Sequence, residues 1–265
     1  MFGWNVAPSQ TIDTLVNLGT HDLHFNIIQG NGTPILFESG NGDDGSVWKP
    51  ILKEIHDSTG ATLITYDRAG LGRSGMDTAR ISFKQEINDL NGALMNLGFG
   101  EDFFLVAHSF GGMYASEFAQ INMGRIQGAV FIDVATPCGL DREYTTKVKN
   151  SITAEIWKML EQYRTGLYHV LKNFPEIAEY MSDRYLPNSV PMTLIVAENY
   201  SPTSQIGETE EDIQHWKECL KKLGSLPNHR YVMTKGTDHK VWAKDPKTVV
   251  NEIVRLYELV GQMRT

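Results

Sequence analysis

Short runs of apolar residues alternate with segments of helical periodicity along most of the chain. Eight short segments have the composition of β-strands: Thr14–Leu18, Leu23–Ile28, Pro34–Glu38, Ala61–Tyr66, Asp102–Ala107, Gly128–Ile132, Met192–Ala197 and His229–Met233. Apolar positions three and four residues apart predict helices over Val47–Ser58, Ser82–Leu97, Gly111–Ile121, Glu210–Leu223 and Pro246–Met263. Most of the strands are apolar at nearly every position, which favours a mainly parallel sheet covered by helices on both faces. The first two strands are joined by a short turn and are expected to form an antiparallel edge.

The alternation stops between Val134 and Val190. This stretch is helical in pattern and rich in aromatic residues and methionine, and the alternation resumes after it. The simplest interpretation is one α/β core formed by residues 1–133 and 190–265, with a helical cap of residues 134–189 inserted after the sixth strand. We expect the cap to lie as a lid over the carboxyl edge of the sheet, which is where open α/β sheets bind ligands.

The chain has 265 residues and a formal net charge of −8. Proteins that bind nucleic acids or anionic membranes usually have a basic excess, so this charge disfavours both partners. No stretch approaches the roughly 18 apolar residues of a membrane span. The first ten residues lack the basic and apolar regions of a signal peptide, so we expect a cytoplasmic protein. Cys138 and Cys219 are too few for a disulfide framework and are expected to be free thiols.

The segment Ala107–Gly112 (AHSFGG) joins a predicted strand to a predicted helix. It resembles the nucleophile elbow G-x-S-x-G, with Ala107 in place of the first glycine. A serine at such a sharp turn has a strained backbone, and bulky residues two positions away on either side would clash. The helix that follows directs its N–H groups at the serine and favours negative charge there. Ser109 is therefore the predicted nucleophile.

The chain resembles the α/β-hydrolase-fold serine hydrolases along nearly its whole length. Besides the elbow, the resemblance rests on three segments: residues 34–42 (PILFESGNG), 67–75 (DRAGLGRSG) and 236–239 (GTDH). It implies a cofactor-free hydrolase in which the serine, an acid and a histidine follow one another along the chain. Together these segments are specific for the fold, but they do not indicate a substrate.

A serine hydroxyl is a weak nucleophile unless a base and an orienting acid activate it. The histidines that follow Ser109 are His169, His215, His229 and His239. His239 lies in a glycine-containing loop between the final strand and the terminal helix, where the resemblance implies the base. His239 is therefore the predicted base.

The acid has more than one candidate. Many members resemble the pattern G-x-x-D after the strand that corresponds to Met192–Ala197, and Tyr200 stands here in place of that aspartate. Other members, including a haloalkane dehalogenase branch, carry the acid at the end of the preceding strand, where this chain has Asp133. We predict Asp133 as the acid, with Glu198 and Asp238 as alternatives.

The resemblance also implies an oxyanion hole built from two backbone N–H groups. One is expected from Phe110, the residue after the nucleophile, and the other from Asn41 in the loop after Pro34–Glu38. Ser39 replaces the histidine that is common at the start of this loop.

The loop Gly40–Gly45 also matches G-x-G-x-x-G, the dinucleotide-binding fingerprint. Asp43 and Asp44 would place two carboxylates where a pyrophosphate must lie, and the loop follows the third strand rather than the first. Metal-binding motifs such as HExxH and paired CxxC are also absent from the sequence, as is a P-loop. We therefore expect no cofactor and no metal site.

The aromatic and methionine-rich cap predicts an apolar substrate pocket, because these side chains adapt to irregular apolar shapes. Trp157, Tyr163 and Tyr168 are the candidates for substrate contact, although they could equally form the cap's own core. We expect a carboxylesterase that acts on an uncharged small-molecule ester or lactone, as a monomer or homodimer. The alternatives are a perhydrolase or amidase with the same residues, and a ligand-binding or signalling protein with little turnover. A dehalogenase is disfavoured because displacement at carbon needs a carboxylate nucleophile.

Overall fold

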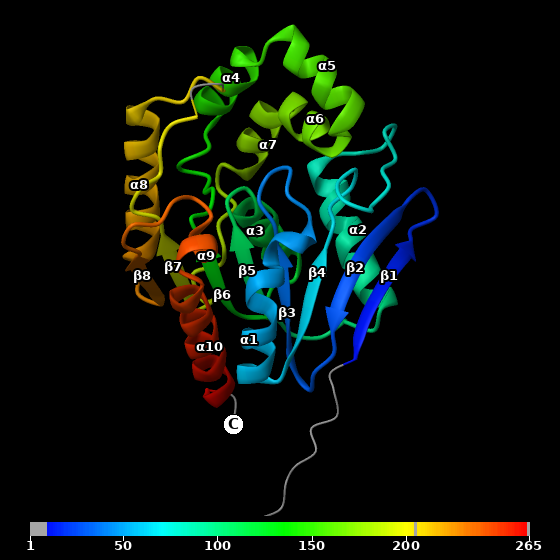
Figure 1. Cartoon of the computed structure of the whole chain (residues 1–265), viewed down its shortest axis with the longest axis vertical. Helices are drawn as coiled ribbons and strands as arrows, with labels where there is room; N and C mark the ends of the chain where they lie inside the picture. Colours follow the sequence, from blue (N-terminus) through cyan, green and yellow to red (C-terminus); the bar gives the residue numbers. More distant parts are fainter. Residues whose placement is uncertain (1–9, 204–205, 264–265) are drawn as a thin grey trace, which may run out of the picture.

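The computed structural model describes residues 10–203 and 206–263 of the chain. The described part contains one eight-stranded sheet with the order β1-β2-β4-β3-β5-β6-β7-β8, and Figure 1 shows helices on both of its faces. The strands are β1 (Thr11–Asn17), β2 (Asp22–Ile28), β3 (Gly32–Glu38), β4 (Ala61–Tyr66), β5 (Phe103–His108), β6 (Ile126–Ile132), β7 (Met192–Val196) and β8 (His229–Met233). All neighbours from β4 to β8 pair in parallel, whereas β2 pairs antiparallel with both β1 and β4. The predicted α/β-hydrolase fold is confirmed.

The helices divide between the two faces of the sheet. The chain forms η1 (Gly45–Trp48), α1 (Lys49–Thr59), α2 (Phe83–Asn96), α3 (Gly111–Ile121), α4 (Arg142–Ser151), α5 (Ala154–Tyr163), α6 (Thr165–Lys172), α7 (Phe174–Met181), α8 (Glu210–Gly224), α9 (Val241–Lys244) and α10 (Pro246–Gln262). One core cluster contains the buried faces of α1 and α10, and the other contains those of α2, α3 and α8. Successive residues of β5 alternate between the two clusters, so this central strand is buried on both faces.

The predicted element boundaries differ from the observed ones mainly at the sheet edge. β1 begins at Thr11 rather than Thr14, because its polar first residues pair with β2 although they bury little apolar surface. The helix predicted from Ser82 begins as expected, since the Ser82 side chain caps α2 by accepting a hydrogen bond from the N–H of Gln85. The N-terminal residues in which no signal peptide is expected lie almost entirely outside the described part.

Helices α4 to α7 lie between β6 and β7 in the sequence and sit above the carboxyl ends of the parallel strands in Figure 1. We refer to residues 134–189 as the cap segment. Its separation from the core as a domain stays a prediction. None of the described helices combines the length and the apolar composition that crossing a bilayer requires.

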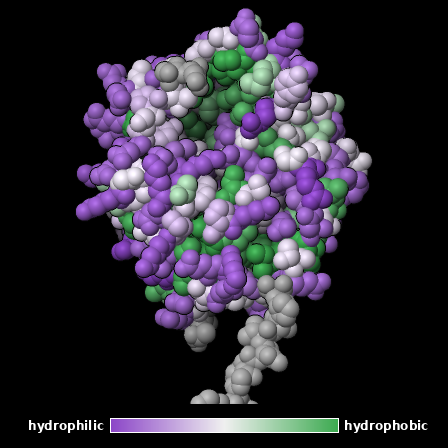
Figure 2. All heavy atoms as spheres, in the orientation of Figure 1, coloured by the Kyte–Doolittle hydropathy of each residue, from purple (hydrophilic) through white to green (hydrophobic). Residues whose placement is uncertain are grey.

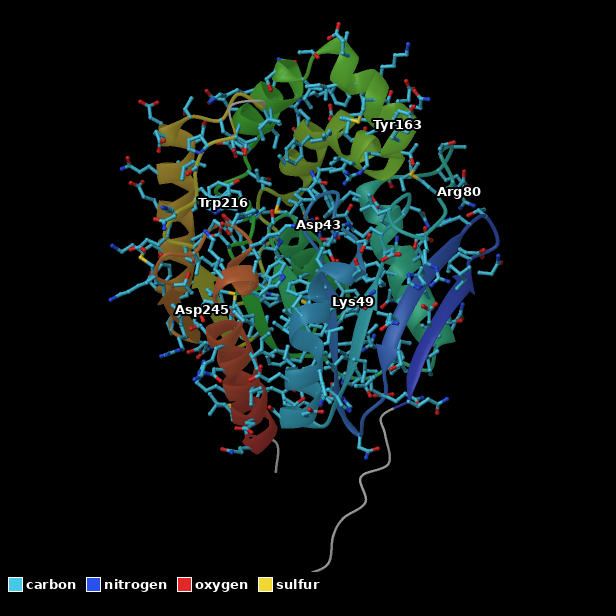
Figure 3. The ribbon with its side chains drawn as sticks, viewed as in Figure 1. Asp43, Lys49, Arg80, Tyr163, Trp216 and Asp245 are labelled. Carbon is cyan, nitrogen blue, oxygen red and sulfur yellow. A yellow bond between two sulfur atoms is a disulfide. The ribbon has the colours of Figure 1, made fainter. Side chains whose placement is uncertain are left out.

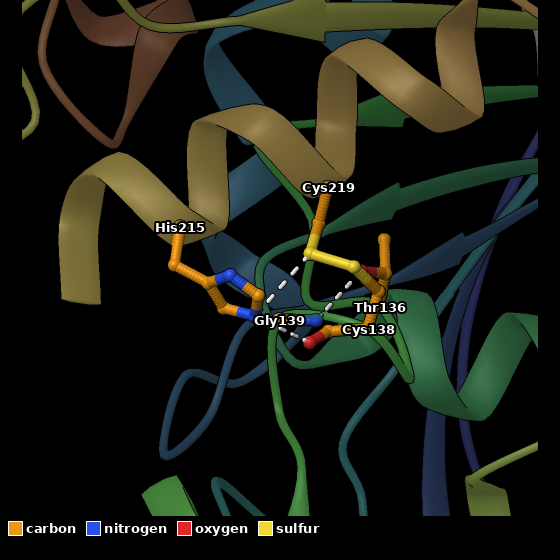
Figure 4. The surroundings of a disulfide bond; sticks show 5 residues. All are labelled: Thr136, Cys138, Gly139, His215 and Cys219. Atoms are coloured by element: carbon orange, nitrogen blue, oxygen red, sulfur yellow. Dashed lines mark hydrogen bonds between the residues drawn. A yellow bond between two sulfur atoms is a disulfide. The ribbon is translucent and has the colours of Figure 1, made fainter. Parts of the chain in front are cut away.

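The expectation of two free thiols is wrong for this structure, which joins Cys138 and Cys219 in a disulfide (Figure 4). The two Cα atoms lie 5.7 Å apart although 81 positions separate the residues in the sequence. The pairing arises because the turn after β6 packs against α8, where Gly139 lies close to Trp216. The number of cysteines in a sequence cannot reveal a contact of this kind.

Gly112 in α3 and Gly92 in α2 give a matched test of how tightly the start of α3 is packed. A Cβ atom on Gly112 would lie 2.6 Å from Cβ of Val134 and 2.8 Å from the carbonyl oxygen of Ala135, whereas one on Gly92 in α2 would meet nothing within 4 Å. Gly112→Ala should therefore lower the free energy of unfolding by about 1–3 kcal/mol. Gly92→Ala should raise it by up to about 1 kcal/mol, because alanine favours helix. Denaturant titration measures both, and equal effects of the two substitutions would contradict this packing.

Candidate active site

Ser109 occupies the turn between β5 and α3 with a φ of 52°, a left-handed conformation that is rare for a residue with a side chain. The small residues around it are needed for steric reasons. A Cβ atom on Gly111 would lie 2.5 Å from the carbonyl oxygens of both Glu38 and Ser39, and Ala107 is fully buried. The elbow therefore fits only because β3 and α3 can approach one another closely.

The structure brings Ser109, His239 and Asp133 together. Nε2 of His239 lies 2.8 Å from Oγ of Ser109, and Nδ1 of His239 lies 2.7 Å from Oδ2 of Asp133. A neutral imidazole in this position donates its Nδ1–H to the carboxylate and accepts the serine hydroxyl proton at Nε2. Asp133 is only 1% exposed, and its Oδ1 accepts a hydrogen bond from the N–H of Ala197 at 3.2 Å.

The two alternative acids lie elsewhere. Glu198 is exposed and accepts a hydrogen bond from the N–H of Gly236 at 2.7 Å, so it braces the loop that carries His239 without contacting the imidazole. Asp238 forms a salt bridge with Lys244 at 2.9 Å. Asp133 is thus the carboxylate that the structure places against His239.

The two predicted oxyanion donors belong to segments next to Ser109. Phe110 is the N-cap of α3, and the loop of Asn41 passes so close that a Cβ atom on Gly40 would lie 3.3 Å from Cβ of Ser109. Neither the Phe110 N–H nor the Asn41 N–H has an acceptor among the residues that the structure describes. Both groups are therefore available to a substrate oxygen.

A buried arginine holds the loop that carries Asn41, and the sequence analysis did not identify it. Nη1 of Arg68 donates a hydrogen bond to the carbonyl oxygen of Ser39 at 2.6 Å, and Nη2 donates to that of Gly40. Arg68 is 4% exposed, and Nη1 lies 3.8 Å from the carboxylate of Glu38. The only signal in the sequence was its place in the DRAGLGRSG turn.

A buried carboxyl group, that of Glu38, and a half-buried one, that of Glu86, accompany Arg68. The hydroxyl of Tyr66 donates a hydrogen bond to Glu38 at 2.9 Å, and the hydroxyl of Tyr114 donates one to Glu86 at 2.9 Å. Burial raises the pKa of Glu38 to about 8 and that of Glu86 to about 7, although the charge of Arg68 opposes both shifts. The loop beside Ser109 therefore rests on a titratable network.

His108 holds the loop of His239 in a similar way. Its Nε2 lies 3.0 Å from the carbonyl oxygen of His239. Burial, and then the nearby His239, lower the pKa of His108 well below its usual value, so the ring is neutral and donates its Nε2–H to that carbonyl. Sequence reasoning missed this contact because 131 positions separate the two residues.

Aromatic side chains surround the site, but they differ from those that the sequence suggested. Tyr163 lies at the edge of the cap segment (Figure 3) and is 70% exposed, and Trp157 and Tyr168 pack against each other. Tyr200 instead packs on the ring of His239 with a centroid distance of 4.6 Å, and Trp216 stacks on Tyr200. In Figure 3, Trp216 extends from α8 toward the space beneath the cap segment.

The cap segment also contacts the loops after β3 and β4 and the start of α3. The guanidinium of Arg164 donates a hydrogen bond to the carbonyl oxygen of Gly42 at 2.5 Å, and the N–H of Gly166 donates to that of Gly70 at 3.3 Å. Phe174 at the start of α7 packs on Phe110 with a centroid distance of 5.5 Å. Figure 2 shows a hollow lined with hydrophobic residues at this end of the molecule.

Comparison with known proteins agrees with this architecture. The sequence profile described as the alpha/beta hydrolase family matches residues 35–260. The chain belongs to this family. Its relatives include the uncharacterized protein YqjL of Bacillus subtilis (strain 168), which is 26% identical over 230 residues covering 83% of this chain and 81% of the relative.

Two further similar proteins have names that describe an enzyme. The putative carbamate hydrolase RutD of Azorhizobium caulinodans is 31% identical over 115 residues, which cover 43% of this chain and 42% of the relative. A thermophilic esterase from Thermogutta terrifontis has a similar fold, with a TM-score of 0.60, 19% sequence identity and coverage of 95% of this chain and 99% of the esterase chain. The family relationship supports hydrolase activity at this level of description.

The raised pKa of Glu38 predicts a pH-dependent stability. Between its ordinary pKa of 4.5 and its folded pKa of about 8, the folded chain keeps a proton that the unfolded chain releases. The stabilisation that comes with this proton is therefore fully present below pH 4.5. It decreases as the pH rises from 4.5 to about 8, and the free energy of unfolding no longer changes through this group above that pH. Gln in place of Glu38 cannot release this proton. Glu38→Gln should therefore lack the part of the decrease in the free energy of unfolding with pH that Glu38 causes.

Denaturant titrations from about pH 5 to 9 would measure the effect. Glu54→Gln, which changes an exposed glutamate on α1, is the matched control and should follow the wild type. A difference between wild type and Glu38→Gln that stays constant across the window would contradict the prediction.

Proposed function

We propose that this protein is a serine hydrolase that cleaves a carboxylic ester or lactone of a largely apolar small molecule. The observation that carries the proposal is the hydrogen-bonded chain from Ser109 through His239 to Asp133, at 2.8 and 2.7 Å, with the serine held in a strained turn. Such an arrangement activates a hydroxyl for attack on a carbonyl carbon.

In the proposed reaction, Oγ of Ser109 attacks the ester carbonyl while Nε2 of His239 takes the hydroxyl proton. Asp133 keeps the imidazole in the required tautomer and stabilises the imidazolium that forms. The N–H groups of Phe110 and Asn41 hold the developing oxyanion, and each is expected to contribute about 10²–10³ in kcat. His239 then gives its proton to the leaving alcohol. Water, deprotonated by the same imidazole, attacks the acyl carbon, and His239 returns that proton to Oγ of Ser109 as the acid leaves. In each step of the proposed reaction, Ser109 or His239 gives or takes the proton that moves. The proposed reaction therefore uses no cofactor.

The walls of the site support an apolar substrate. The rings of Tyr200 and Trp216 lie beside that of His239, and the ring of Phe174 in the cap segment packs on that of Phe110. Aromatic walls favour apolar acyl or alcohol groups over charged ones.

Cleavage of a C–N bond is the second candidate function. The partial similarity to a putative carbamate hydrolase favours it, and the same three residues can form an acyl-enzyme from an amide or carbamate. A perhydrolase would use the same residues with peroxide in place of water. A ligand-binding protein with little turnover would retain the geometry but fail the labelling test that follows.

Ser109→Ala should abolish both labelling by a fluorophosphonate and the hydrolysis of short p-nitrophenyl esters, with kcat lower by about 10⁴–10⁶. The reason is that both reactions need the Ser109 oxygen. Gel-based labelling and a p-nitrophenolate assay measure them. Ser58→Ala, which changes an exposed serine on α1, is the matched control and should behave as the wild type. Absence of labelling and of turnover in the wild type would overturn the proposal.

Asp133→Asn should lower kcat by about 10⁴, because an amide cannot hold His239 in the Nδ1–H tautomer. Glu198→Gln should change kcat less than tenfold, because Glu198 touches the loop and not the ring. Steady-state kinetics on chains with unchanged thermal unfolding compare the two. A larger loss from Glu198→Gln than from Asp133→Asn would assign the acid to Glu198 instead.

A further inference from the structure

A second cluster of reactive side chains lies outside the candidate active site. Figure 4 shows Cys138, His215 and Cys219 side by side, with the two cysteines joined in the disulfide. One ligand atom from each of the three residues lies within 4.8 Å of the other two. Nothing in the proposed reaction uses these residues.

The imidazole and one sulfur already have a separation that suits metal binding. His215 and Cys219 lie four positions apart on α8, so they share one face of the helix. Nε2 of His215 lies 3.6 Å from Sγ of Cys219. A tetrahedral zinc ion with bonds of about 2.3 Å to sulfur and about 2.0–2.1 Å to nitrogen holds these two atoms about 3.5 Å apart.

The third ligand comes from a compact turn. The N–H of Gly139 donates hydrogen bonds to both the carbonyl oxygen and Oγ1 of Thr136, at 3.0 and 3.2 Å, so the turn around Cys138 is held in place. Sγ of Cys138 must move away from Sγ of Cys219 to reach the about 3.8 Å that two thiolates adopt around zinc, which a side-chain rotation allows. Nε2 of His215 lies 3.0 Å from the carbonyl oxygen of Cys138 and would exchange that contact for the metal.

We propose that the reduced chain binds one zinc ion through Cys138, His215 and Cys219. Disulfide and metal are then alternative states of one site. A thiol or phosphine reductant supplies the two electrons, and solvent the two protons, that convert the disulfide into two thiols. The thiols lose their protons as the metal binds.

The surroundings leave room for a fourth ligand. A surface cavity of about 460 Å³ adjoins both cysteines and includes Asp183 in its lining, and His215 is exposed. A metal ion can therefore enter, and water can complete a tetrahedral set. The site would tie the start of the cap segment to α8, close to Trp216 and its contact with Tyr200.

Cobalt binding to the full-length protein tests the proposal. The chain is reduced with a phosphine, freed of reductant without oxygen, and titrated with Co²⁺. We expect one equivalent to produce a sulfur-to-cobalt charge-transfer band with ligand-field bands of tetrahedral intensity, and Zn²⁺ to remove them. The oxidised chain should give no band, because a disulfide offers no thiolate.

Substitutions separate the three ligands. Cys138→Ser and Cys219→Ser should each lose the charge-transfer band of the 1:1 complex, and His215→Gln should weaken Co²⁺ binding at least about tenfold. His169→Gln, in the cap segment, is the matched histidine control and should bind as the wild type. Thiol counting and circular dichroism verify that each chain is reduced and folded.

A reduced, folded wild type without the band would overturn the proposal, as would a band that survives in Cys219→Ser. Because neither readout depends on turnover, failure here leaves the proposed hydrolase function untouched.

Discussion

The strained backbone of Ser109 is the constraint on which the rest of the site depends. A left-handed residue with a side chain costs about 1–2 kcal/mol and persists only where its surroundings leave no alternative. Here the surroundings are hydrogen bonds on both sides of the peptide: the Ser109 N–H donates to the carbonyl of Ile132, and the Ser109 carbonyl accepts from Gly112 and Ala135. Asp133, at the end of the adjacent strand, has a similar φ of 44°. Two neighbouring strand ends thus both turn sharply, and His239 bridges the side chains that these turns expose.

Much of this arrangement could be predicted because it follows from local patterns and parallel pairing. The small residues around Ser109 mark a turn in which a helix approaches another strand closely, and the apolar runs before Ser109 and Asp133 mark buried strands. Parallel strands end at one edge of a sheet, so residues that follow two adjacent strands lie close together wherever they stand in the sequence. The loop of His239 follows β8 at the same edge.

What escaped prediction depends on contacts between residues far apart in the sequence that have no local signature. Glu38 looked like the polar end of a strand, yet it is fully buried beside Arg68, because the loop after β4 folds back under the loop after β3. Tyr200 and Trp216 lie beside His239 only because the β7 loop and α8 converge there. The disulfide depends on the same convergence.

If Asp133 is the acid, as proposed, Tyr200 can occupy the place of the aspartate in the family pattern G-x-x-D. With Asp133 directly after β6, the loop after β7 has only to pack on the imidazole, and Tyr200 does so as an uncharged ring. Its burial, and then the charge of Glu208, raise the pKa of the Tyr200 phenol well above its ordinary value, so the ring does not compete for Nδ1 of His239 as a charged partner. Asp133 is also the last residue before the cap segment. The orientation of the His239 imidazole is therefore coupled directly to the anchoring of the cap segment. An acid after β7 would not couple the two.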